Sequence, residues 1–260
     1  MKFILAALLL AWSATAEAGV DENVLKQLVP TGALRAGIAY SPTPTPVFAA
    51  KDVSGGIRGV PKDIAAALAK SLGVPVEYVV KATTGELTDA CSSGAIDIGF
   101  MPADDERRKR VDFSPPYFMI ESTYLALGST DIKTLADVDR TDITVVGING
   151  STTMRAAGRT LKNAKVIGAK SVDEALEILK AGGAQAFALT HDSLPALQKQ
   201  LPGSRILDGA FQKVDVSVAV QKDKPAALAY VKDFVISAKT NGIVRKAFDD
   251  AGLKGLAIPP

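Results

Sequence analysis

The stretch that decides the fold reads G-F-M-P-A-D-D-E-R-R-K-R-V-D-F-S-P-P-Y and occupies residues 99–117. It starts inside an alternating apolar segment at 96–101, which predicts a buried strand. A dense group of charged residues follows, and S-P-P-Y at 114–117 predicts an aromatic, proline-stiffened turn before a second strand near 124–127. A charged loop after a buried strand is a candidate ligand site, although the same pattern also describes solvated surface.

Strand and helix patterns alternate on both sides of this stretch. In the first series we expect strands at 34–40, 76–80 and 96–101, with helices at 62–72 and 87–93. In the second series we expect strands at 143–148, 164–168 and 186–189, with helices ending near 161 and 182 and a capping box at 171–174. A last strand at 214–220 precedes two helices at 225–239 and 243–250. This order predicts an α/β fold with parallel strands and crossover helices.

No flexible linker separates the two series, so we expect two lobes joined by strands that cross between them, near 122–127 and 213–216. The predicted division is a signal peptide at 1–18, lobe 1 at 19–123 and 216–260, and lobe 2 at 124–215. Open α/β sheets bind ligands beyond the carboxyl ends of their strands. The loops at 101–107 and 149–153 both follow strands and are therefore expected to face a cleft between the lobes.

The N-terminus has the features of an export signal. Lys2 precedes an apolar run at 3–12, and A-x-A cleavage sites end at Ala16 and Ala18. The run is far shorter than the ~20 residues that span a bilayer, and no other segment qualifies as a membrane span. We therefore expect the mature protein to be free in the periplasm after cleavage.

Net charge and cysteine content give further information on the expected partners and on the absence of a disulfide. The formal net charge is +2, which gives no indication of nucleic acid as a partner. Cys91 is the only cysteine, so the chain forms no internal disulfide, and we expect this thiol to lie buried in a helix.

Several short motifs, taken in order, resemble one known family. They are G-A-L-R-A-G at 32–37, Gly59 with Asp63-Ile64, L-G-V at 72–74, S-G-A-I-D at 93–97, Glu106-Arg107 followed by V-D-F-S at 111–114 and Tyr117, and the strand and loop at 145–152. Together they resemble the bacterial periplasmic solute-binding proteins of ABC importers, in the polar amino-acid-binding family (family 3).

The resemblance implies a type II periplasmic-binding fold, in which two lobes close over a small ligand by a hinge motion. It also implies a receptor, not an enzyme, for a small polar carboxylate-bearing solute, either an amino acid or a related metabolite. Its partner would be the ABC importer permease of the inner membrane, which recognises the closed form. We expect a monomer without a cofactor or bound metal.

The resemblance assigns the central binding role to Arg107, which matches the arginine that grips a ligand carboxylate. A guanidinium offers a planar fork to two oxygens and stays charged at neutral pH. Ser151 and Thr152 match the element that presents amides and hydroxyls to the same carboxylate, although either would also serve as an ordinary helix cap. We expect residues 108–110, which follow Arg107, to form a solvated basic surface.

Two departures from the family pattern concern the ligand. Pro102 and Asp104 stand where the family usually has threonines, so one amide donor is lost and a negative charge is added. Asp104 could cap the short turn, neutralise Arg107 or contact a cationic group of the ligand.

The second departure follows the strand at 186–189, where amino-acid binders carry an aspartate for the ligand ammonium group. Thr190, His191 or Asp192 could occupy this place, and Asp192 is the best chemical candidate. His191 is read as a polar residue near the cleft, with a hydrogen bond to the ligand as an alternative. If no acid reaches the pocket, the ligand need not be an α-amino acid.

Apolar walls of the pocket are expected from Tyr40, Phe48, Phe100 and Met101, although strand alternation also fits Phe100 as a core residue.

Two other classes of function remain open. One is an enzyme on the same fold, resembling the cyclohexadienyl or arogenate dehydratases, with Asp104, Glu106 or Glu121 as the acid. The other is an exported accessory protein without a role in small-molecule transport.

Overall fold

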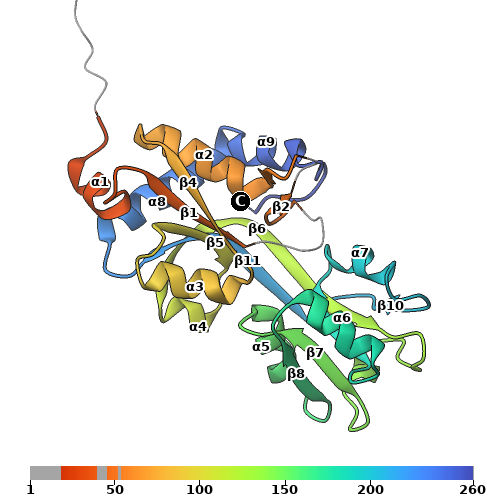
Figure 1. Ribbon diagram of the computed structural model, residues 1–260. Helices are drawn as coiled ribbons and strands as arrows, with labels where there is room; N and C mark the ends of the chain where they lie inside the picture. Colours follow the sequence, from red (N-terminus) through yellow and green to blue (C-terminus); the bar gives the residue numbers. More distant parts are fainter. Residues whose placement is uncertain (1–18, 40–45, 52–53, 260) are drawn as a thin grey trace, which may run out of the picture.

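The computed structural model describes residues 19–39, 46–51 and 54–259. The predicted signal peptide at 1–18 and the candidate site residue Tyr40 lie outside these ranges. Helices and strands alternate along the described chain, which confirms the predicted α/β class (Figure 1). Among the described residues, no helix is both long and apolar enough to cross a membrane.

One nine-stranded sheet runs through the described part of the molecule. From one edge to the other its strands are β4 (Val76–Lys81), β1 (Leu34–Ala39), β5 (Ile98–Pro102), β11 (Gln212–Gln221), β6 (Val111–Ala126), β9 (Ala186–Thr190), β7 (Thr144–Ile148) and β8 (Lys165–Ala169), while β10 (Arg205–Ile206) pairs with β6. A separate hairpin contains β2 (Ala50–Lys51) and β3 (Ile57–Arg58). Strands β4, β1 and β5 are parallel to one another, as are β8, β7 and β9. The predicted parallel series are confirmed.

Two lobes form around the two parallel groups, and β6 and β11 run between them as an antiparallel pair (Figure 1). The first lobe carries α1 (Glu22–Leu28), α2 (Val60–Leu72), α3 (Thr84–Ser92), α4 (Asp105–Arg108), α8 (Pro225–Thr240) and α9 (Ile243–Asp250). The second lobe carries η1 (Ala136–Val138), α5 (Thr152–Thr160), α6 (Val172–Lys180) and α7 (Leu194–Gln198). The chain thus returns to the first lobe through β11, and its last two helices pack there against α1 and α2.

The predicted turn at 114–117 is wrong, because these residues lie inside the long strand β6. The prolines are accommodated by two irregularities in the pairing with β11, between Val216 and Ser217 and between Ser217 and Ala219. A proline has no backbone N–H to donate to a neighbouring strand. Irregularities of this kind, called β-bulges, interrupt the regular pairing at such a position. The Ser114 hydroxyl accepts a hydrogen bond from the amide of Val218 at 3.1 Å and so provides a local substitute for ladder pairing.

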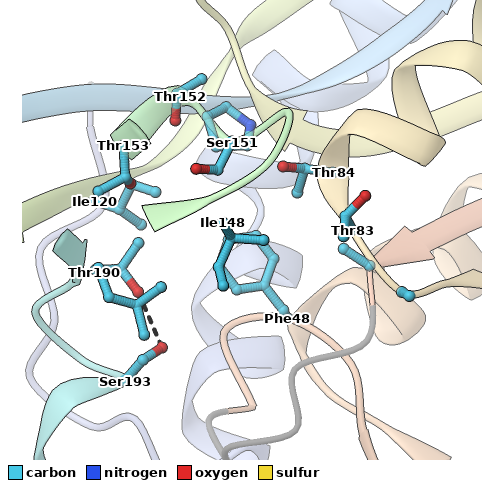
Figure 2. A pocket seen from close by; sticks show the side chains of 14 residues that line it. Phe48, Thr83, Thr84, Ile120, Ile148, Ser151, Thr152, Thr153, Thr190 and Ser193 are labelled. Carbon is cyan, nitrogen blue, oxygen red and sulfur yellow. Dashed lines mark hydrogen bonds between the residues drawn. The ribbon is translucent and has the colours of Figure 1, made fainter. Parts of the chain in front are cut away.

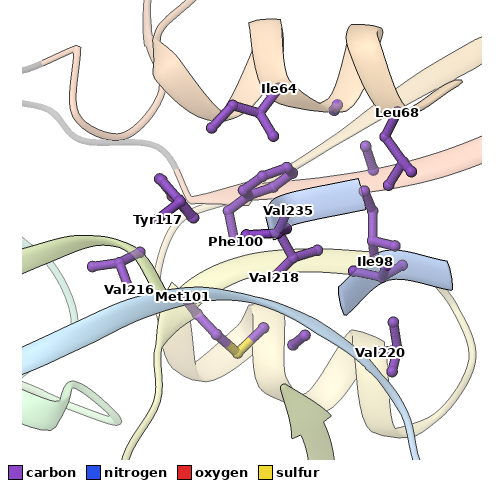
Figure 3. Close-up of a cluster of buried hydrophobic side chains, with 14 of the residues drawn as sticks. Ile64, Leu68, Ile98, Phe100, Met101, Tyr117, Val216, Val218, Val220 and Val235 are labelled. Carbon is purple, nitrogen blue, oxygen red and sulfur yellow. The ribbon is translucent and has the colours of Figure 1, made fainter. Parts of the chain in front are cut away.

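The buried core follows the same two-part division. One large cluster is built from residues 24–120 and 214–248, and two smaller clusters are built from residues 124–207. Figure 3 shows the large cluster, where Phe100 of β5 points toward α2 and Met101 points to the opposite face of the sheet. Cys91 is fully buried in α3, which confirms its predicted place. Burial also raises the pKa of this thiol to about 12.

Candidate functional site

A cavity of about 110 Å³ lies where the carboxyl ends of strands from both lobes meet (Figure 2). Its lining is apolar with several hydroxyl groups, and it comprises Ala39, Phe48, Ala82, Thr83, Thr84, Pro102, Ile120, Ile148, Ser151, Thr152, Thr153, Leu189, Thr190 and Ser193. Strands β1, β5, β7 and β9 all end at this cavity. The position agrees with the expectation that ligands bind beyond the carboxyl ends of strands.

Two helices begin at the cavity, one from each lobe. Thr83 caps α3 by accepting a hydrogen bond from the amide of Glu86 at 3.1 Å. Ser151 caps α5 by accepting one from the amide of Met154 at 3.0 Å. The first amides of a helix have no partner within the helix and carry a partial positive charge. The two helix starts therefore favour an anionic or oxygen-rich group between them.

The two helix starts come very close together. A Cβ atom added to Gly85 would lie 3.2 Å from the Cα atom of Gly150, and Gly150 adopts a φ of +72°. Glycine tolerates this conformation at little cost because it has no side chain. Glycines at both positions therefore allow the lobes to meet beside the cavity.

Arg107 lies behind the cavity lining, with only 2% of its surface exposed. Its guanidinium donates to the carbonyl oxygens of Pro102 at 2.8 Å and Gly150 at 3.0 Å, and to the hydroxyl of Thr84 at 2.7 Å. Burial and the neighbouring charge of Arg155 lower the pKa of Arg107 to about 10, so the side chain stays positively charged at neutral pH. The guanidinium of Arg107 therefore acts on the cavity indirectly, through its hydrogen bond to Thr84, which is one of the lining residues.

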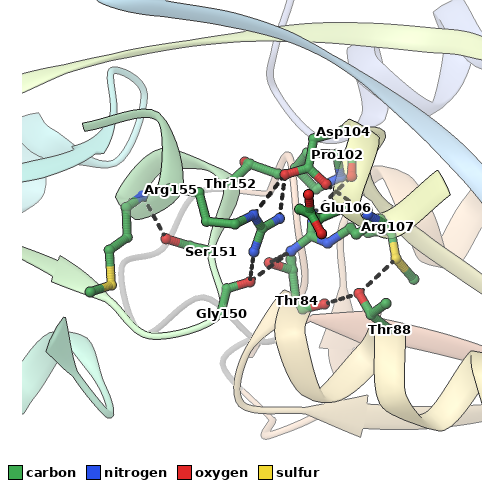
Figure 4. A network of polar contacts seen from close by, with 12 residues as sticks. Thr84, Thr88, Pro102, Asp104, Glu106, Arg107, Gly150, Ser151, Thr152 and Arg155 are labelled. Atoms are coloured by element: carbon green, nitrogen blue, oxygen red, sulfur yellow. Dashed lines mark hydrogen bonds and ion pairs between the residues drawn. The ribbon is translucent and has the colours of Figure 1, made fainter. Parts of the chain in front are cut away.

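Asp104 and Arg155 form an ion pair between the lobes (Figure 4). The Asp104 carboxylate accepts from the Nε of Arg155 at 2.8 Å and also from its Nη2. The other Asp104 oxygen accepts from the amide of Arg107 at 3.1 Å and caps α4. The Gly150 carbonyl accepts from both arginines, at 3.0 Å from Arg107 and 3.1 Å from Arg155. Asp104 was expected to cap the turn, to neutralise Arg107 or to contact the ligand. The structure shows that it caps α4 and that it forms an ion pair with Arg155.

The other candidates divide between the cavity wall and the protein interior. Phe48, Ser151 and Thr152 line the cavity. Met101 is fully buried, and its sulfur accepts a hydrogen bond from the Thr88 hydroxyl at 3.3 Å, so its side chain is part of the core and not of the wall. The basic residues 108–110 are exposed, as expected.

His191 and Asp192 line a second cavity, which shares Ile120 with the first. This cavity also contains Met119, Glu121 and the C-terminal residues 256–259. Both side chains are exposed, whereas their neighbours Thr190 and Ser193 point into the first cavity and bond to each other at 2.9 Å. Thr190, one of the three alternatives for this place, is therefore the one at the cavity.

Sequence reasoning missed Thr84 and Arg155. Thr84 opens α3, which starts three residues before the predicted position because Thr83 caps it. The T-T-G-E pattern at 83–86 is a capping signature that could have revealed this start. For Arg155 no local signal exists, because its partner Asp104 lies 51 residues away.

Comparison with known proteins agrees with this geometry. Over residues 37–250 the sequence matches the bacterial extracellular solute-binding proteins, family 3. The chain belongs to this family. It is 30% identical to a glutamine-binding protein of Geobacillus stearothermophilus over 212 residues, which covers 80% of this chain and 79% of the relative. It is also 25% identical over 254 residues to the cyclohexadienyl dehydratase of Pseudomonas aeruginosa, which covers 92% of this chain and 90% of that enzyme.

A solved structure extends the comparison to three dimensions. The crystal structure of an ancestral amino acid-binding protein, described as a precursor of cyclohexadienyl dehydratase, superposes with a TM-score of 0.71 at 30% identity. The match covers 87% of this chain and 98% of that one. The predicted two-lobed, type II periplasmic-binding fold and the predicted family are both confirmed.

Proposed function

We propose that this protein is an exported receptor of an ABC importer, which binds a small polar carboxylate-bearing solute between its lobes. The observation that carries the proposal is the cavity lined by residues from both lobes, with a helix start from each lobe at its wall. A ligand in this place contacts both halves of the molecule at once. The solute-binding relatives support the same role.

The proposed mechanism is closure about the crossing strands. We place lobe 1 at 19–123 and 216–260 and lobe 2 at 124–215, because the core clusters separate near these positions. Only β6 and β11 run through both lobes in the described structure, so bending there moves one lobe against the other. A ligand that contacts both lobes favours the closed state, and the free energy of closure then comes from its differential affinity.

The proposed binding set contains Phe48, Ser151, Thr152 and Thr84, with Arg107 supporting Thr84 from behind. Phe48 provides an apolar wall, and the hydroxyls provide polar contacts. The proposed location is the periplasm after cleavage of residues 1–18, and the proposed partner is the inner-membrane permease of the importer. No cofactor is assigned, and we propose that the receptor acts as a monomer.

The dehydratase relative makes an enzyme the second candidate. Proton transfer requires an acid or base within hydrogen-bond reach of the substrate. Among the described residues, the cavity is lined by no Asp, Glu, His, Lys or Arg, and Asp104 is engaged with Arg155. The cavity chemistry therefore favours a receptor over a dehydratase.

Two measurements on the mature protein test the receptor proposal. In a thermal-shift screen of amino acids, oxo acids and other small organic acids, a ligand at 100 times its Kd adds about 2.7 kcal/mol to the free energy of unfolding. For each ligand found, small-angle scattering should show a smaller radius of gyration at saturation. An unchanged radius would contradict closure, and turnover of a cyclohexadienyl substrate such as prephenate would favour the enzyme.

A further inference from the structure

Among the described residues, the lining of the cavity between the lobes offers hydrogen-bond donors and no anionic side chain. Thr84 Oγ1 already accepts from Arg107, and Ser151 Oγ already accepts from the amide of Met154. Each hydroxyl has a single hydrogen, and neither hydrogen has an acceptor among the described residues. Figure 2 shows Thr84 of the first lobe and Ser151 of the second lobe on neighbouring parts of the cavity wall. A ligand held between them is therefore met by O–H donors.

The surroundings of these hydroxyls are positive. The guanidinium of Arg107 lies 2.7 Å behind Thr84, and α3 and α5 both begin at the cavity wall. Helix starts and a buried guanidinium favour negative charge at the same place. The site thus suits a carboxylate and any further acceptor oxygen next to it.

The described part of the cavity wall offers no anionic partner to a cationic group. The described lining residues include no acidic side chain, and the acids nearest in sequence to the lining, Asp192 and Glu121, line the second cavity. Asp104 is committed to Arg155 and to the start of α4. A buried ammonium without an anionic partner is strongly disfavoured. The zwitterion of an α-amino acid therefore fits only at its carboxylate end.

The remainder of the lining is apolar. Its large apolar side chains are those of Phe48, Ile120, Ile148 and Leu189. We infer that this cavity selects a small 2-oxo monocarboxylate with an apolar side chain over the corresponding α-amino acid. The inference rests on the proposed receptor function and specifies its ligand class. Such a ligand presents three acceptor oxygens, which match the donors, and carries no ammonium group.

Matched ligand pairs test this directly by calorimetric titration of the mature wild-type protein. The pairs are 4-methyl-2-oxopentanoate with L-leucine, 3-methyl-2-oxobutanoate with L-valine, and phenylpyruvate with L-phenylalanine, and L-glutamine serves as a polar amino acid. Within each pair only the 2-oxo group and the ammonium differ. We expect at least one oxo acid to bind about 100-fold more tightly than its amino-acid partner.

Two variants test the role of the donors. Thr84→Val and Ser151→Ala each remove one hydroxyl, and either should weaken oxo-acid binding about 10-fold or more. Thr240→Val is the matched control, because its hydroxyl lies on α8 and bonds only to carbonyls of that helix. Circular dichroism confirms the fold of each variant, and the wild-type titrations test the inference without any variant.

The outcomes separate this inference from the receptor proposal. An amino acid that binds as tightly as its oxo acid, or more tightly, overturns the inference and leaves the receptor standing. Loss of that amino-acid binding in Asp192→Asn would identify Asp192 as the ammonium partner. If no member of either set binds, the inference falls, and the receptor proposal is decided separately by the wider thermal-shift screen. Unchanged oxo-acid binding in both Thr84→Val and Ser151→Ala also overturns the donor argument.

Discussion

The ion pair between Asp104 and Arg155 joins the two lobes beside the cavity, so its removal should open the molecule. The most informative change is Asp104→Asn. Asparagine is as good a helix cap as aspartate, so the hydrogen bond from the amide of Arg107 is kept. What is lost is the charge, together with the two-pronged contact to Arg155.

The magnitude follows from the burial of the pair. The side chain of Asp104 is 9% exposed and that of Arg155 is 27% exposed, so solvent screens the contact only in part. A hydrogen bond to a charged group contributes about 1.5–3 kcal/mol, and the exposed side of Arg155 regains some water in the variant. We therefore expect the closed form to lose about 1.5–3 kcal/mol relative to the open form, which is roughly 10- to 150-fold in their ratio.

Scattering and calorimetry together measure this shift. Without ligand, Asp104→Asn should have a larger radius of gyration than the wild type, and the Kd of any cavity ligand should rise. Asp131→Asn is the matched control, because Asp131 forms a two-pronged contact with Arg140 inside the second lobe. If the radius and the Kd of Asp104→Asn both equal those of the wild type, the pair does not hold the lobes together and the reasoning is refuted.

Four further predictions concern three residues of the first lobe. Burial raises the pKa of the Cys91 thiol to about 12, so the native thiol should not react with an aromatic disulfide reagent at pH 8 until urea unfolds the protein. Because the unfolded thiol loses its proton first, the free energy of unfolding should fall between pH 9 and about 12, by at most about 1.4 kcal/mol per pH unit. Asp97→Asn should lower the free energy of unfolding, measured in urea, by about 2–4 kcal/mol. The reason is that the buried Asp97 carboxylate accepts hydrogen bonds from the backbone amide of Arg35, at 2.8 Å, and from the guanidinium of Arg35. An unchanged free energy of unfolding would contradict this. Tyr117→Phe should raise the melting temperature by an amount equivalent to about 1 kcal/mol, because the buried hydroxyl has no partner among the described residues; a lower melting temperature would contradict it.

The sequence was most informative where the physical cause is local. Hydrophobic periodicity and caps placed helices such as Val60–Leu72 and Ile243–Asp250 to within two residues. The order of elements then fixed the α/β class, because crossover connections between parallel strands allow few topologies. The same order, without a linker between the two series, predicted the two lobes and the loops that face the cavity, and the family motifs added Arg107 as the expected ligand contact.

The turn predicted at 114–117 failed for a reason that local rules do not contain. Two adjacent prolines normally break a strand, but here a partner strand distant in sequence adapts with two bulges. The Ser114 hydroxyl takes over one backbone contact. The pairing partner, and not the local preference, decided the conformation.

The chemistry of the site depended on tertiary structure to the same degree. From the sequence alone, residues 99–117 supplied Arg107 as a ligand contact and Asp104 with three possible roles. In the fold, Arg107 supports Thr84, while Asp104 pairs with Arg155 across the lobes. Short periodic patterns thus determined the elements and their order. Which charges meet was decided only when residues more than forty positions apart came into contact, because hydrogen bonds and burial depend on distance in space.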